Sequence, residues 1–202
     1  MSKQFIRLIF FFFFLEFVSI AQTDLIDECF INFENATTLK ASDAERLPEK
    51  APKSRKVSIS DSKDAKISRI DGYRKIYKNV NKTEFVNIKV ELSSPKKYAD
   101  DQKYLLANME YIRSISSAMQ ADGIIELEFN GYKFYGLSRF GDDAGETIGI
   151  FMMFPGNNIS VHFYFKNIDK EHRHYQNVDE YRVLRDKFME EYAAHLAECL
   201  NN

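Results

Sequence analysis

Apolar and polar residues alternate along residues 86–92, where every second position is apolar and the positions between are Asn, Lys and Glu. This period of two is typical of a half-buried strand, whose successive side chains point to opposite faces of a sheet. A weaker alternation over residues 73–77 predicts a strand before it. The apolar positions of the clearer strand are Val86, Ile88, Val90 and Leu92.

A helix is predicted directly after this strand. Ser94 suits the cap position and Pro95 suits the first turn, because proline lacks an N–H that the first turn leaves unpaired. Apolar residues then recur at spacings of three, four and seven as far as residue 119, which predicts one buried face, and Asp122-Gly123 ends the helix.

Four further strands are predicted as a meander. Asn130-Gly131 joins residues 125–129 to residues 132–135, and this dipeptide between alternating runs is the strongest short hairpin signal. We therefore expect Phe129 and Tyr132 to be cross-strand neighbours.

The other two strands of the meander are residues 147–154 and 159–166, joined by the turn at 155–158. The first is apolar on both faces and is expected to be central. In the second, Ile159, Val161, Phe163 and Phe165 are expected to face the core, with Ser160, His162, Tyr164 and Lys166 on the other face.

A final helix is predicted from about Val178 to Leu200. Asn177 occupies the cap position and Glu180 follows three residues later, an arrangement similar to a capping box. Its apolar stripe ends at Cys199, which is therefore expected to point inward.

The order strand, helix, four-strand meander, helix predicts an α+β domain with an antiparallel sheet packed by two helices. Over residues 71–200 this order resembles the PsbP-like α/β/α sandwiches, a group of exported or lumenal accessory proteins. Its first five elements also resemble the cystatin fold. The resemblance rests on element order, since no residue motif of either family is present. The Gln-x-Val-x-Gly sequence of cystatins is absent, which argues against protease inhibition.

The N-terminus reads as a secretory signal peptide at residues 1–21. Lys3 and Arg7 precede an apolar run of about ten residues, and Ser19-Ile20-Ala21 supplies the small residues that signal peptidase selects. The run is too short for a membrane span and is broken by Glu16. We expect a secreted or periplasmic protein without a stable membrane span after cleavage; the alternative is an uncleaved anchor.

The remaining chain divides by composition. Residues 22–40 are predicted to be an N-terminal segment, residues 41–70 a charged linker and residues 71–202 the α+β domain. The linker carries two prolines and many charges, too little apolar surface to offset the entropy of ordering it.

Charge and motifs exclude several partners. The net charge is −2, and it becomes −3 once the leader with Lys3, Arg7 and Glu16 is removed. A nucleic-acid-binding protein usually has a strong basic excess, so no nucleic acid is expected. No phosphate loop or other cofactor motif occurs, and no cofactor is expected.

The two cysteines, Cys29 and Cys199, are predicted to form one disulfide in an oxidising compartment. The alternative is a pair of independent buried thiols, because cysteine also packs as a small apolar residue.

Four candidate metal ligands gather in one predicted loop. Asp169, Glu171, His172 and His174 lie within six residues, and imidazole and carboxylate groups can bind zinc. The alternative is a solvated, charged loop. A second acidic loop, residues 139–146, could hold calcium, although its ligand order does not match the helix-loop-helix site.

Two functions remain. The first is an exported, non-catalytic accessory or binding protein whose partner is a protein or a small apolar or aromatic ligand. Its candidate surface residues are Tyr135, Phe151, Met153 and Tyr164. The second is a hydrolase or metal-dependent enzyme using His162, His172 or His174, which would need a histidine and a carboxylate to converge.

Overall fold

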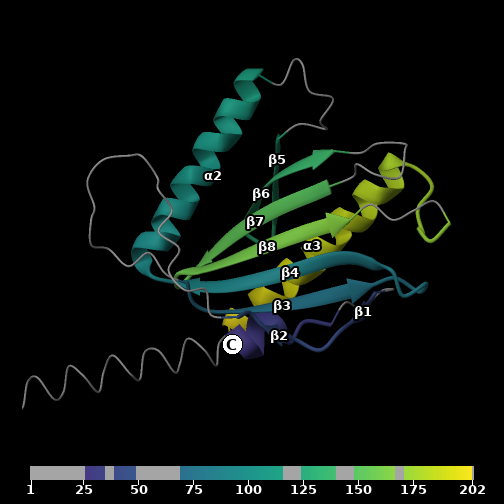
Figure 1. Ribbon diagram of the computed structural model, residues 1–202, viewed down its shortest axis with the longest axis horizontal. Coiled ribbons are helices and arrows are strands. Elements are labelled where there is room, and N and C mark those ends of the chain that lie inside the picture. Colours follow the sequence, from purple (N-terminus) through teal and green to yellow (C-terminus); the bar gives the residue numbers. More distant parts are fainter. Residues whose placement is uncertain are drawn as a thin grey trace, which may run out of the picture.

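The computed structural model describes residues 26–34, 39–48, 69–115, 124–139, 148–166 and 171–201. These residues form an α+β fold in which one eight-stranded antiparallel sheet is packed by two main helices (Figure 1). The predicted fold class is thus confirmed. The elements in chain order are η1 (Ile26–Ile31), β1 (Lys40–Ala41), β2 (Glu45–Arg46), β3 (Arg69–Lys78), β4 (Glu84–Ser93), α2 (Pro95–Ile115), β5 (Ile124–Phe129), β6 (Tyr132–Arg139), β7 (Ile148–Gly156), β8 (Ile159–Lys166) and α3 (Val178–Asn201).

The strands lie in the order β1-β3-β4-β8-β7-β6-β5, and β2 also pairs with β3. The four-strand meander is therefore a run of neighbours, and β4 joins it by pairing with β8. At the β5–β6 turn, Asn130 and Gly131 have φ of 50° and 81°, as a two-residue hairpin requires. Phe129 is paired with Tyr132, as predicted.

One face of the sheet packs on α3, and we call it the α3 face. The predicted inward residues of β8 are all buried there, and rings from the sheet contact rings of the helix. Phe163 meets Tyr192 edge to face at 5.2 Å between centroids, and Phe165 meets Phe188 at 5.9 Å. Such pairs add to the stabilisation that burial of their area provides.

The start of α3 follows the prediction. The side-chain oxygen of Asn177 accepts hydrogen bonds from the backbone N–H groups of Asp179 and Glu180, both 3.0 Å, as a helix cap does. The Glu180 carboxylate accepts a hydrogen bond from the N–H of Gln176 at 2.7 Å, one residue before the cap.

Helix α2 packs on the opposite face, which we call the α2 face. Ser94 caps the helix by accepting a hydrogen bond from the N–H of Lys97 at 3.3 Å. Tyr98 in its first turns meets Phe154 of β7 edge to face at 5.5 Å. In Figure 1, α2 starts beside the end of β4 and is inclined to the strands, whereas α3 passes behind the sheet.

The N-terminal segment is fixed to the α3 side. Cys29 in η1 forms a disulfide with Cys199 in α3, which confirms the predicted bond. The buried ammonium of Lys75 donates to the carbonyl oxygens of Ile31 (2.9 Å) and Phe33 (3.0 Å). These bonds satisfy acceptors at the end of η1 that burial would otherwise leave unpaired.

The sheet begins earlier in the chain than the pattern predicts. Residues 40–46, assigned mostly to the charged linker, contribute β1 and β2 along the edge of β3. Arg46 also forms an ion pair with the buried carboxylate of Asp71 at 3.0 Å. The signal peptide and residues 49–68 lie outside the described residues, as does the predicted helix end at Asp122-Gly123.

Candidate functional site

The α2 face carries half-buried aromatic and aliphatic side chains in two rows that cross the sheet. Strand pairing aligns Tyr135, Met152, His162 and Lys89 in the first row. The second row lies two residues away along each strand and consists of Leu137, Ile150, Tyr164 and Asn87. Ile150 is the most exposed of the apolar members, at 38%. The face is thus neither a sealed core nor a charged, solvated surface.

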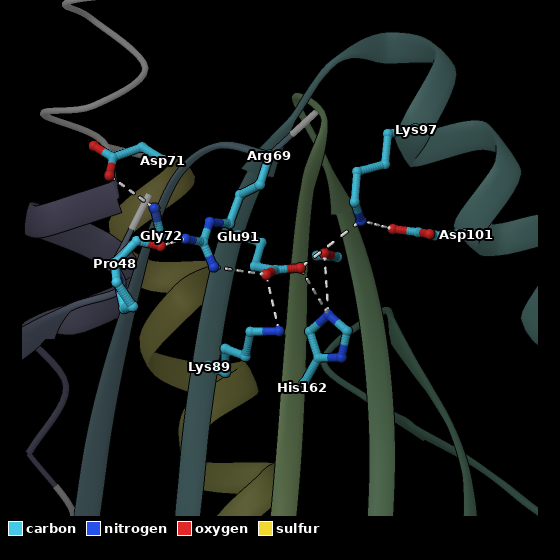
Figure 2. A network of polar contacts seen from close by, with 10 residues as sticks. Pro48, Arg69, Asp71, Gly72, Lys89, Glu91, Lys97, Asp101 and His162 are labelled. Carbon is cyan, nitrogen blue, oxygen red and sulfur yellow. Dashed lines mark hydrogen bonds and ion pairs between the residues drawn. The ribbon is translucent and has the colours of Figure 1, made fainter. Parts of the chain in front are cut away.

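The first row ends at a cluster of ionisable residues around Glu91, which we call the Glu91 cluster: Arg69, Lys89, Glu91, Lys97 and His162. Figure 2 shows these side chains converging from β3, β4, α2 and β8. The Glu91 carboxylate lies 2.8 Å from Lys89 Nζ, 3.4 Å from Arg69 Nη1 and 3.8 Å from Lys97 Nζ. Lys97 also forms an ion pair with Asp101, one turn along α2.

Burial and charge act in opposite directions on Glu91. Burial raises the pKa of its carboxyl, but the hydrogen bond from Lys89 and the positive charges of Lys89 and Lys97, joined in acid by protonated His162, outweigh it. The pKa of Glu91 therefore lies below its ordinary value, and the carboxylate stays charged at neutral pH. Its role in the fold is to hold three cationic side chains at one end of the α2 face.

His162 is uncharged near pH 7, in contrast to Glu91. Burial, followed by the charge of Lys89, lowers the pKa of His162 to about 4 against the attraction of Glu91. The imidazole is therefore neutral near pH 7, and Tyr164 stacks parallel to it at 6.3 Å between centroids.

Ser160, His162 and Glu91 lie together but do not have the arrangement of a catalytic triad. Nε2 of His162 faces both the Ser160 hydroxyl, at 3.3 Å, and the Glu91 carboxylate, at 3.7 Å. In a triad the two ring nitrogens face different partners, so that a proton can pass from the nucleophile to an oriented base. Ser160 is also only 1% exposed.

The four predicted surface residues do not share a face. Tyr135 and Tyr164 are half-buried on the α2 face, one in each row. Phe151 and Met153 are buried on the α3 face, and the guanidinium of Arg185 lies 5.1 Å above the Phe151 ring. The expectation of an exposed surface is therefore wrong for Phe151 and Met153, because β7 is apolar on both sides and its sequence does not tell which side is covered.

The described part of the predicted histidine-containing loop, residues 171–174, is tied to the β3–β4 turn. The carbonyl oxygen of His172 accepts hydrogen bonds from the side-chain amides of Asn79 (2.9 Å) and Asn81 (3.1 Å). His174 packs edge to face on Phe85, and burial lowers its pKa. Glu171 is exposed and Asp169 lies outside the described residues. Within the described residues, no three His, Cys, Asp or Glu side chains are placed to hold a metal ion. Most of the acidic loop at 139–146 is also outside them.

Sequence reasoning missed the Glu91 cluster. Lys89 and Glu91 are two residues apart in a predicted strand, which does place them on the same face. The proximity of His162 depends on the antiparallel register of β4 with β8, however, and that of Lys97 depends on where α2 leaves the sheet. Neither can be read from spacing along the chain.

Comparison with known proteins adds no relatives: no family model, curated protein or solved structure matches this chain. The resemblance in element order to PsbP-like proteins therefore stays a prediction. In the described part of the chain, none of the helices has the length and apolar character needed to span a membrane.

Proposed function

We propose that this chain is an exported, non-catalytic binding protein that holds a small apolar or aromatic ligand on its α2 face. The observation that carries the proposal is the pair of half-buried rows, in which Tyr135, Met152 and Ile150 lie on the face opposite α3. Apolar side chains in contact with solvent and flanked by a few fixed polar groups are typical of ligand sites. The disulfide is consistent with export.

The rival hypothesis of a hydrolase or metal-dependent enzyme has less support. His162 directs a single ring nitrogen at both of its polar neighbours. At the β3–β4 turn, the backbone carbonyl of His172 is held by Asn79 and Asn81, and the ring of His174 packs on Phe85. No observation favours a specific reaction at either place.

Equilibrium binding of N-phenyl-1-naphthylamine, a neutral fluorophore that brightens in apolar surroundings, tests the proposal. We expect saturable binding that falls at least about fivefold in Ile150→Asn, because that change replaces an apolar contact by a polar one. Val183→Asn is the matched control: Val183 is 64% exposed on α3, away from the rows.

Two results would contradict the proposal. One is the absence of saturable binding by the folded wild-type protein. The other is an equal loss in Ile150→Asn and Val183→Asn, which would place the fluorophore elsewhere. Circular dichroism of each variant establishes that the comparison is between folded proteins.

A further inference from the structure

The Glu91 cluster holds more positive than negative charge. Arg69, Lys89 and Lys97 are cationic, and the carboxylates that they contact are Glu91 and Asp101. His162 adds no charge near pH 7. Among these groups one positive charge is left without a matching negative one.

The surplus charge is accessible on the α2 face. The side chains of Lys89 and Lys97 are 22% and 21% exposed, whereas Arg69 is only 7% exposed. Because these lysines are partly removed from water, an anion that contacts them would be attracted more strongly than at an open surface.

The first row runs from the surplus positive charge at Lys89 across the side chain of Met152 to Tyr135. Lys89 is paired with His162, His162 with Met152 and Met152 with Tyr135, on four adjacent strands. With adjacent strands about 4.8 Å apart, Lys89 and Tyr135 are separated by about 14 Å along the row.

The position of the surplus charge gives a bound ligand one orientation. Lys89 and Lys97 lie at one end of the first row, and Met152 and Tyr135 lie farther along it. An anionic group is therefore favoured at the Lys89 end, with the apolar part of the ligand toward Met152 and Tyr135.

We infer that the ligand of the α2 face is a small amphipathic organic anion, whose acidic group contacts Lys89 and Lys97 and whose apolar body lies across Met152 and Tyr135. The inference rests on the proposed function, and it adds the chemical class and orientation of the ligand.

A matched pair of fluorophores tests it. 8-Anilinonaphthalene-1-sulfonate is N-phenyl-1-naphthylamine with one added sulfonate, so the ratio of their dissociation constants isolates the anionic group. For the wild-type protein at low salt we expect the sulfonate to bind at least about fivefold more tightly. We expect that preference to fall toward one in 0.5 M NaCl, because salt screens partly exposed charges.

Lys89→Gln and Lys97→Gln should each reduce the preference and leave binding of the neutral fluorophore unchanged. Lys187→Gln, at an exposed position on α3, is the control and should retain it. Lys97→Gln is expected to disturb the fold less than Lys89→Gln, because Lys97 lies farther from Glu91, 3.8 Å against 2.8 Å for Lys89. The salt dependence of the wild-type protein needs no variant at all.

The outcomes separate the two proposals. Equal affinity for the two fluorophores would overturn the inference while the proposed function stands. A preference that persists in both lysine variants would place the sulfonate elsewhere and would also overturn it. If neither fluorophore binds, the proposed function fails as well.

Discussion

Tyr192, in the middle of α3, donates its hydroxyl hydrogen to the carbonyl oxygen of Phe30 at 2.9 Å, although the two residues are 162 positions apart. Both residues are buried, and burial raises the pKa of Tyr192 well above its ordinary value. The hydroxyl therefore stays protonated and acts as a permanent donor to the N-terminal segment. The contact makes η1 a part of the core rather than an appendage.

Tyr192→Phe should lower the free energy of unfolding by about 1–3 kcal/mol, because it leaves the buried carbonyl of Phe30 without this donor. Urea denaturation measures the change. Tyr104→Phe is the control, since Tyr104 is 68% exposed on α2 and should change stability little. An equal effect of the two substitutions would contradict the role given to the hydrogen bond.

Replacement of both cysteines by serine should lower the free energy of unfolding by about 4–5 kcal/mol in the chain-entropy model, because the bond joins residues 170 positions apart. The measurement is urea denaturation of Cys29→Ser/Cys199→Ser beside the oxidised wild-type protein. Wild-type protein in reducing agent should behave as the double variant does. A loss below about 1 kcal/mol would show that the closed loop contributes little.

His162 should make the protein less stable in acid. Because its folded-state pKa, about 4, lies below the ordinary 6.5, the unfolded chain binds more protons between these values. Its contribution is complete above pH 6.5 and is lost as the pH falls toward 4, by up to about 3 kcal/mol.

The variant that checks this linkage is His162→Asn, with unfolding followed from pH 4.5 to 7. We expect its stability to fall less steeply with acid than that of the wild-type protein. His172→Asn controls for removal of one exposed histidine. Above pH 4.5 the titration of Glu91, whose folded-state pKa is lowered, contributes little. Parallel curves for wild type and His162→Asn would exclude His162 as the source of the acid sensitivity.

Gly136→Ala should destabilise the fold by about 2–3 kcal/mol or more, because a Cβ there would lie 2.3 Å from a ring carbon of Phe151 and 2.5 Å from the Ile150 carbonyl oxygen. Thermal unfolding gives the comparison with Ser138→Ala on the same strand. Ser138 is buried and its hydroxyl has no hydrogen-bond partner among the described residues, so its removal should be neutral or stabilising. A Gly136→Ala protein as stable as Ser138→Ala would show that the Phe151 ring moves aside freely.

Elements with local signals were predictable from the sequence. The Asn130-Gly131 turn, the Ser94 cap and the Asn177 cap each depend on residues within a few positions, and each is confirmed. The disulfide was predictable because two cysteines allow a single pairing.

Features that depend on the tertiary structure were not predictable. Strands β1 and β2 have two residues each, too few for a period, and β3 gives them their conformation. Because β7 is apolar on both sides, its sequence pattern does not predict that Phe151 faces α3 whereas Met152 faces α2. The Glu91 cluster needs four elements to be placed before its members meet.

The disulfide turns residues 29–199 into one covalent ring. A protease that cuts any single peptide bond of this ring, for example in the proline- and lysine-containing stretch at 49–68, opens it without separating the fragments. The pieces on either side of the cut would stay at high effective concentration and could keep their strands paired. A single cut within the ring thus leaves the molecule covalently in one piece until the disulfide is reduced.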